Sequence, residues 1–327
     1  MEIRLLRAAD VRRLLPMAAC VDLMHKTMIA VSEGRALVPL RSILRLPGGR
    51  GAMGNMPGYL ADPECFGLKL ISLMPGNKPP LFSSHLGIVL LFEPEHGQPV
   101  ALLDGATITA IRTAAASALA TRLLARADAG DLAILGAGEQ AASHLEAMLT
   151  VRALRRVRLW ARDPVKARAF AQEQSDRHGI GIETCGSPAE AVHEADLICT
   201  VTKAGEPILE GAWLSAGAHL NVVGSSVASA AEVDSATVVR SRLFVDRRES
   251  IVNEGGEYLR ALRAGLIAPE HVLAEIGEVA NGSKLGRRAP EDVTLYKSLG
   301  IAPQDLAAAH FILEQARRSG AGEVIHF

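Results

Sequence analysis

The sequence has 327 residues, with 49% hydrophobic and 22% charged residues and a formal net charge of −1. A chain of this length exceeds one typical hydrophobic core, so we expect two domains. The near-neutral charge excludes the basic surface of a nucleic-acid-binding protein and a polybasic membrane segment. No apolar run reaches the roughly 20 residues that span a bilayer, and the N-terminus has no signal-peptide pattern.

The cysteines are scattered, without Cys-x-x-Cys spacing and without a nearby His at metal-ligand spacing. We therefore expect reduced, mostly buried thiols, no metal site and a cytoplasmic protein, and a catalytic cysteine is the less favoured interpretation. The cysteines are Cys20, Cys65, Cys185 and Cys199.

Residues 1–115 are punctuated by Pro and Gly and contain short apolar runs bounded by turn residues, a pattern typical of strands. They predict a smaller α+β domain with an opening helix at about Cys20–Ser32. The pair His96-Gly97 predicts a hairpin turn between the last two strands. The expected strands are Lys69–Met74, Gly87–Glu93 and Val100–Asp104.

An Ala-rich segment at Ala106–Ala125 predicts a long helix that connects the two domains. Its small residues would also allow the close approach of another helix at a dimer contact. An amphipathic helix at Ile301–Arg318 is expected to pack back on the first domain, which would then comprise residues 1–115 and 301–327.

Strand-like runs alternate with helical segments from Asp131 onward. This alternation predicts an α/β fold, a Rossmann-type doubly wound parallel sheet at residues 116–300. The helix after the second strand has Asp163 as its expected N-cap, and Ser187 with Glu190 predicts a capping box for the next one. The expected strands are Leu132–Leu135, Val157–Trp160, Ile180–Cys185, Leu197–Val201, His219–Val223 and Leu243–Val245.

A glycine-rich loop follows the first of these strands and opens a helix, where a dinucleotide-binding loop belongs. Gly136 permits the tight turn, Gly138 lets the backbone approach a pyrophosphate, and Ala141 replaces the third glycine. The helix N-terminus offers free N–H groups to phosphates. A glycine turn without a ligand is the alternative. The expected cofactor contacts in this loop are Gly136, Ala137, Gly138, Glu139 and Gln140.

The end of the second strand discriminates between the two nicotinamide cofactors, because an acid there favours NAD and a cation favours the 2′-phosphate of NADP. The sequence is Trp160-Ala161-Arg162-Asp163. Arg162 suits a bidentate phosphate contact, and Asp163 is better used as a helix cap. We predict NADPH at this position, with NADH as the alternative because a shift of one residue would restore an acid.

Three basic residues of the first domain lie among apolar ones. Arg41 follows an apolar segment, Lys69 opens a strand of buried character, and Arg112 interrupts the apolar face of the Ala-rich helix. An unpaired buried cation is costly, so each calls for an anion, which a substrate carboxylate would supply.

Several ordered segments together resemble the ornithine cyclodeaminase/mu-crystallin family, and they extend over nearly the whole chain. In the first domain they are Val38-Pro39-Leu40-Arg41, Gly54-Asn55-Met56-Pro57, Gly67-Leu68-Lys69-Leu70, Leu90-Leu91-Phe92-Glu93-Pro94, Asp104-Gly105-Ala106-Thr107-Ile108-Thr109 and Arg112-Thr113-Ala114-Ala115. Beyond it they are Ile134-Leu135-Gly136-Ala137-Gly138, Glu206-Pro207-Ile208-Leu209, Glu275-Ile276-Gly277-Glu278 and Lys297-Ser298-Leu299-Gly300.

The resemblance implies a homodimer of two-domain subunits, in which the first domain binds substrate and dimerises and the Rossmann domain binds NAD(P). It puts Arg41, Lys69 and Arg112 on carboxylate-binding positions and Met56 on a pocket wall. His85 lies in a family-like segment and is expected either to line the site or to make a structural hydrogen bond.

Two departures from the ornithine cyclodeaminase pattern bear on the reaction. Ser226 stands where those enzymes place an Asp that handles the substrate amine, and Gly54 stands where they carry a Glu. Without these carboxylates a cationic diamine substrate is disfavoured. The sequence is closer to the ketimine reductase branch, which implies reduction of Δ1-pyrroline-2-carboxylate or Δ1-piperideine-2-carboxylate to L-proline or L-pipecolate.

In this hypothesis Arg112, Arg41 and Lys69 hold the substrate carboxylate, and Ser226, a water or Lys69 handles the nitrogen proton. Thr202, at the end of the fourth strand, and Ser225 are expected to contact the cofactor. The alternatives are an alanine dehydrogenase, a cis-3-hydroxy-L-proline dehydratase, an ornithine cyclodeaminase and a non-catalytic NADPH-dependent binding protein.

Two C-terminal segments carry charge without an assigned contact. The acidic segment Glu249–Glu257 is interpreted as a solvated loop and helix start rather than a metal site. The segment beginning at Lys297 is expected to return to the active site.

Overall fold

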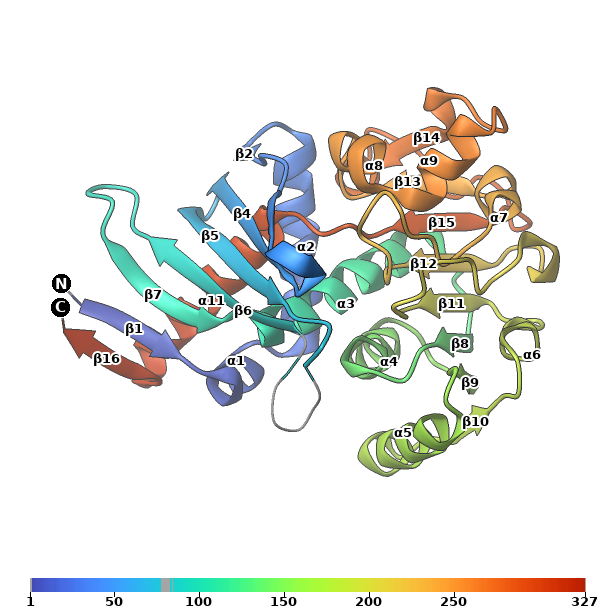
Figure 1. The fold of residues 1–327 in the computed structure, drawn as a ribbon, viewed down its shortest axis with the longest axis horizontal. Coiled ribbons are helices and arrows are strands. Elements are labelled where there is room, and N and C mark those ends of the chain that lie inside the picture. Colours follow the sequence, from blue (N-terminus) through green and yellow to red (C-terminus); the bar gives the residue numbers. More distant parts are fainter. Residues whose placement is uncertain (1, 78–82, 84, 327) are drawn as a thin grey trace. The chain divides into compact units, whose positions relative to one another are not determined.

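The protein is seen here in a computed structural model that describes residues 2–77, 83 and 85–326 (Figure 1). The chain divides into two compact units, one of Met1–Arg112 with Ile301–Phe327 and the other of Thr113–Gly300. Helix α3 (Gly105–Leu124), the predicted Ala-rich helix, runs from the first unit into the second.

The first unit contains an eight-stranded mixed sheet in the order β16-β1-β7-β6-β5-β4-β2, with β3 paired to β4. The hairpin β6–β7 turns at Gly97, which has a φ of 71°, so the predicted turn is confirmed. The remaining elements of this unit are β1 (Glu2–Leu6), α1 (Ala8–Leu14), α2 (Met17–Ser32), β2 (Ala36–Leu37), β3 (Ser42–Arg45), η1 (Pro47–Gly49), β4 (Ala52–Ala61), β5 (Glu64–Leu73), β6 (His85–Phe92), β7 (Pro99–Asp104), α11 (Ala302–Ser319) and β16 (Glu323–His326).

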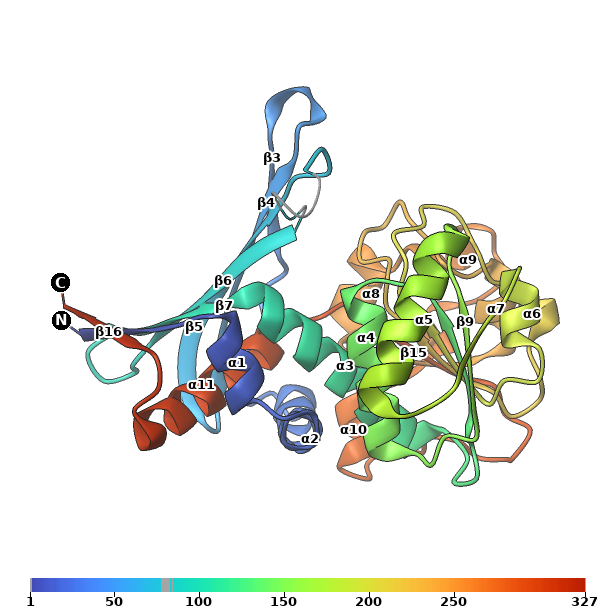
Figure 2. The ribbon, with the colours of Figure 1, turned by 90° about the horizontal axis from the view of Figure 1, so that it is seen from below.

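Helices α1, α2 and α11 lie along one face of this sheet (Figure 2). Two glycines let α11 approach closely, because a Cβ at Gly58 would meet the Ala302 side chain at 2.9 Å and one at Gly67 would lie 3.2 Å from Leu306. The predicted return of the C-terminal helix to the first domain is therefore confirmed.

The second unit is a wholly parallel sheet in the order β10-β9-β8-β11-β12-β15-β13-β14. The chain moves outward from β8 to β10, with α4 and α5 on one face, and then returns to β11 with α6 on the other (Figure 1). The strand order thus reverses between β8 and β11, the place where doubly wound sheets bind ligands. The predicted Rossmann-type fold class is confirmed.

The strands of this unit are β8 (Asp131–Leu135), β9 (Arg156–Trp160), β10 (Ile182–Thr184), β11 (Leu197–Thr200), β12 (His219–Val222), β13 (Arg242–Val245), β14 (Val272–Glu275) and β15 (Thr294–Lys297). Its helices are α4 (Glu139–Val151), α5 (Pro164–His178), α6 (Pro188–Val192), η2 (Gly211–Trp213), α7 (Ser235–Arg240), α8 (Arg248–Glu254), α9 (Gly256–Arg263), η3 (Pro269–His271) and α10 (Ile276–Ala280).

The two predicted helix caps have different outcomes. Asp163 accepts hydrogen bonds from the backbone N–H of Val165 at 3.0 Å and of Lys166 at 3.2 Å, as expected. Ser187 accepts from the N–H of Glu190 at 3.1 Å, but the Glu190 carboxylate accepts from Gly186 instead of the cap residue. The prediction of a full capping box was therefore wrong, because the carboxylate reaches one residue farther back.

Among the described residues, no single helix has the length and hydropathy of a membrane span, and the bent pair α1–α2 meets those two criteria only jointly. Within the same residues no group of His, Cys, Asp or Glu has the arrangement of a metal site. The cysteines are free thiols, and all but Cys185 are buried, as predicted.

Candidate functional site

A buried charge cluster in the first unit joins two of the predicted cations. Lys69 is 3% exposed and Arg112 4% exposed, and both contact the fully buried carboxylate of Asp305 on α11. The Lys69 Nζ lies 2.8 Å from Asp305 Oδ2, and the Arg112 Nε donates to Oδ1 at 2.9 Å. Arg112 also donates through Nη1 to the Gln304 side-chain oxygen at 2.7 Å, and Lys69 to the Thr109 hydroxyl at 3.4 Å.

Burial and charge perturb the ionisation of this cluster. Burial, the largest cause, and the charges of Arg112 and Arg41 lower the pKa of Lys69, Asp305 raises it, and the net result is a pKa of about 8. Burial raises the pKa of Asp305, but the charges of Arg112 and Lys69 outweigh it and the net direction is downward. At neutral pH the cluster therefore holds an ionised Asp305 beside a lysine that exchanges its proton readily.

The neighbours of Lys69 on the sheet include the expected pocket residue. Met56 on β4 pairs directly with Lys69 on β5 and is buried. Arg41 is half-buried and lies close enough for its charge to affect Lys69. His85 is exposed and starts β6, four residues from the Val89 that pairs with Lys69, which is roughly 13 Å along the strand. Its placement in the site remains a prediction.

The glycine-rich loop in the second unit has the backbone that a dinucleotide site needs. Gly136 is buried with a φ of 130°, and a Cβ there would lie 2.8 Å from the Val201 carbonyl oxygen. Gly138 is the N-cap of α4 and has no side-chain cap, and a Cβ there would meet no heavy atom within 4 Å. This open space lies in front of uncapped helical N–H groups, which is the arrangement that holds a phosphate.

The other loop residues differ in exposure. Ala137 and Gln140 are half-buried, and Glu139 is exposed. The Gln140 side-chain oxygen is buried without a hydrogen-bond partner in the described part of the chain. After β9, Asp163 is engaged as a helix cap and Arg162 is exposed.

The predicted cofactor residues after β11 and β12 are bound to acids whose burial the sequence analysis did not predict. The Thr202 hydroxyl donates to Glu232 at 2.6 Å. The Ser225 hydroxyl donates to Glu257, so its side chain points inward, whereas Ser226 is half-buried.

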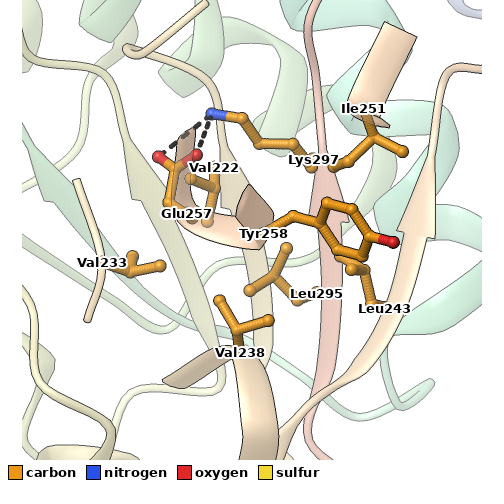
Figure 3. Close-up of a pocket in the computed structure, with 9 residues that line it drawn as sticks. All are labelled: Val222, Val233, Val238, Leu243, Ile251, Glu257, Tyr258, Leu295 and Lys297. Carbon is orange, nitrogen blue, oxygen red and sulfur yellow. Dashed lines mark hydrogen bonds and ion pairs between the residues drawn. The ribbon is translucent and has the colours of Figure 1, made fainter. Parts of the chain in front are cut away.

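The interpretation of the acidic segment Glu249–Glu257 as solvated was wrong for Glu257. It is 4% exposed and pairs with the buried Lys297 at 3.1 Å. Figure 3 shows the pair at the edge of a cavity of about 10 Å³, which is the size of one water. Lys297 ends β15, a strand missed by the sequence analysis, and it donates to the Ser225 carbonyl at 2.6 Å.

Known proteins resemble this chain in sequence and in fold. The model of the ornithine cyclodeaminase/mu-crystallin family matches residues 1–320. The chain belongs to this family. A ketimine reductase mu-crystallin of Mus musculus is 39% identical over 283 residues, which are 86% of this chain and 86% of that protein. A Delta(1)-pyrroline-2-carboxylate reductase of Bacillus cereus is 34% identical over 321 residues, 98% of each chain.

A solved structure of the same family extends the likeness to the fold. Thermococcus litoralis Delta(1)-pyrroline-2-carboxylate reductase in complex with NADH and L-proline matches with a TM-score of 0.95 and 37% identity, over 98% of this chain and 99% of that one. The family membership predicted from the motifs is therefore confirmed.

Proposed function

We propose that this protein is a nicotinamide-dependent reductase of a cyclic ketimine carboxylate, Δ1-pyrroline-2-carboxylate or Δ1-piperideine-2-carboxylate, with L-proline or L-pipecolate as the product. The observation that carries the proposal is the buried cluster of Lys69, Arg112 and Asp305. The names of the relatives support it, because proteins that match this chain over most of their length are named as reductases of ketimines or of Delta(1)-pyrroline-2-carboxylate.

The net positive charge of the cluster favours a substrate with a single carboxylate. Arg41, Lys69 and Arg112 bring three positive charges, and Asp305 cancels one of them. A monocarboxylate substrate reduces the remaining excess, and Arg112 can offer it the guanidinium nitrogen, Nη2, that neither Asp305 nor Gln304 occupies.

The surroundings of the cluster disfavour a substrate with a second amine. A Cβ at Gly54 would lie 2.8 Å from Cγ1 of Ile71, so a glutamate at this position has no room unless Ile71 moves. Ser226 provides a hydroxyl where a cyclodeaminase has a carboxylate. The apolar Met56 beside Lys69 suits a compact ring.

Reduction of the imine requires a hydride at carbon and a proton at nitrogen. The bound cofactor supplies the hydride. We assign the proton to Lys69, because a pKa of about 8 makes it an effective acid near neutral pH. Arg112 and Arg41 would orient the substrate through its carboxylate, and Ser226 is the second candidate for the nitrogen proton.

The residues of the second unit fit a nicotinamide dinucleotide, since the space at Gly138 faces the uncapped N-terminus of α4. We propose NADPH rather than NADH, with Arg162 on the 2′-phosphate. The engagement of Asp163 as a helix cap supports this choice, because its Oδ1 already accepts two backbone hydrogen bonds from the helix that follows β9.

We also propose a homodimer formed through the sheet of the first unit. Leu44, Met53 and Leu86 lie in one cross-strand row, and they are 58%, 42% and 51% exposed. Ser72 stands between Met53 and Leu86 in this row. The three apolar residues occupy the face opposite to Lys69, while α11 packs on the Lys69 side. An apolar sheet face of this kind marks a protein interface. The double variant Leu44→Asp, Met53→Asp should be monomeric by light scattering, and an unchanged dimer mass would refute this interface.

The reaction is tested by following NADPH and NADH absorbance with the five- and six-membered cyclic imino acids. Ornithine, alanine and cis-3-hydroxyproline are assayed in parallel. We expect imine-dependent oxidation of NADPH and formation of the L-imino acid. No imine-dependent oxidation of either cofactor would overturn the proposal, and ammonia with proline from ornithine would show a cyclodeaminase instead.

A further inference from the structure

Glu232 is a fully buried carboxylate that binds the ends of two adjacent parallel strands. Its Oε1 accepts from the N–H and the hydroxyl of Thr202, both at 2.6 Å, directly beyond β11. Its Oε2 accepts from the Thr200 hydroxyl at 2.8 Å and from the Gly224 N–H, directly beyond β12, at 2.6 Å. Each oxygen thus has two donors, the pattern that satisfies an ionised carboxylate.

The buried network around Glu232 has more negative than positive charge. Glu257 and Lys297 neutralise each other, and the Glu257 Oε1 accepts from the Glu232 N–H at 3.0 Å. With its four donors Glu232 is suited to the ionised form, and in that form it adds one carboxylate charge that no partner among the described residues neutralises. Burial raises the pKa of Glu232 above its ordinary value, and the hydrogen bonds with Thr202 and the charge of Lys297 offset this only in part. Such an excess charge is costly unless a cation lies nearby.

The topology indicates which part of a dinucleotide lies near Glu232. The pyrophosphate loop follows β8, and Arg162, on the adenosine side, follows β9. Strands β11 and β12 lie on the other side of β8. A dinucleotide bound across the carboxyl ends of the strands at this switch point would bring its nicotinamide half to the ends of β11 and β12.

We infer that Glu232 is a positioning residue that also sets the preference between the two cofactor redox states. Its carboxylate fixes the ends of β11 and β12, and its charge favours the cationic, oxidised nicotinamide ring over the neutral, reduced ring. A fixed negative charge at this place also favours hydride donation, which leaves the ring positive. The inference rests on the proposed function only for the identity of the cofactor.

The test is the ratio of the dissociation constants for oxidised and reduced cofactor in the Glu232→Gln variant of the full chain. Both constants are measured by calorimetric titration with NADP+ and NADPH, and again with NAD+ and NADH, without any imino acid. We expect affinity for the oxidised form to fall about tenfold relative to the reduced form, which corresponds to about 1.4 kcal/mol. Equal changes in both constants would overturn the inference.

Thr200→Val is the matched control, because it removes one donor to the same carboxylate and leaves the charge in place. It should loosen the network without changing the ratio. The same change of ratio in Thr200→Val would assign the effect to strand geometry and refute the role of the charge.

A measurement on the unmodified protein covers the case in which Glu232→Gln does not fold. NAD+ is compared with benzamide adenine dinucleotide, which carries an uncharged ring of nearly the same shape. The inference requires NAD+ to bind more tightly, and equal affinities would overturn it. Absence of imine reduction would refute the proposed function and leave these binding ratios interpretable, since neither experiment uses a substrate.

Discussion

Replacing Asp305 by Asn tests the chemistry of the buried cluster most directly. The substitution preserves the size of the side chain and removes the carboxylate that contacts both Lys69 and Arg112. These two cations, 3% and 4% exposed, would then face each other without an anion. We expect both the stability of the protein and the ionisation of Lys69 to change.

The magnitudes follow from the burial of the pair. Removing one partner of a buried ion pair costs about 3–5 kcal/mol in the free energy of unfolding, which lowers the melting temperature by roughly 6–20 °C in a domain of this size. Lys69 already has a pKa lowered to about 8, and Asp305 opposes that shift. Without Asp305 the pKa of Lys69 falls below 8, so the lysine loses its proton within the neutral range.

The assay is the pH dependence of kcat/KM for the cyclic imino acid. In the wild type kcat/KM should decline above pH about 8, as Lys69 loses its proton. In Asp305→Asn the decline should begin at lower pH, and a shift of one pKa unit gives about a threefold loss at pH 7.5, because the protonated fraction of Lys69 falls from roughly three quarters to one quarter. Asp246→Asn is the control, because Asp246 is equally buried but binds the Leu299 and Gly300 N–H groups. A decline that stays at pH 8 in Asp305→Asn would refute the reasoning.

Three further substitutions separate substrate binding from cofactor binding. Arg112→Ala should lower kcat/KM about 100-fold through the loss of charge-assisted hydrogen bonds, with an unchanged cofactor dissociation constant in fluorescence titration; full activity would exclude its carboxylate role. Gly138→Ala should weaken cofactor binding about tenfold with an unchanged melting temperature, because its Cβ projects into open space; unaltered binding would move the pyrophosphate elsewhere. Arg162→Ala should weaken NADPH binding at least tenfold and NADH binding less than twofold; equal effects in titrations with both cofactors would count against the 2′-phosphate contact.

The predictable part of the fold is the part with local signals. β8 and the start of α4 follow from an apolar run and a glycine loop, and α3 follows from a long Ala-rich segment. Strand β15 has only four residues, all buried, and it lies between β12 and β13 although it comes much later in the chain. Its sequence, Thr-Leu-Tyr-Lys, lacks the apolar run that marks the equally short β11, so only the assembled sheet shows it.

The residues of the candidate site also divide into those that the sequence reveals and those that only the structure shows. Lys69 and Arg112 attract attention in the sequence because they interrupt apolar segments. Their partner Asp305 lies in an amphipathic helix where an acid is ordinary, and 193 residues separate it from Arg112. Glu232 and Glu257 were missed for the same reason, since an acidic residue in a loop or helix start gives no sign of burial.

The position of Asp305 in the sequence has a consequence for folding during translation. Lys69 and Arg112 leave the ribosome before the whole of the second unit, and Asp305 comes after it. The first unit therefore holds two uncompensated cations until α11 has been synthesised, whereas the second unit is one continuous segment that can fold as it emerges. Without Asp305, Lys69 and Arg112 have no anion to pair with, so the first unit should fold only after α11 has been made. A ribosome stalled before α11 should therefore carry a folded second unit and a protease-sensitive first unit.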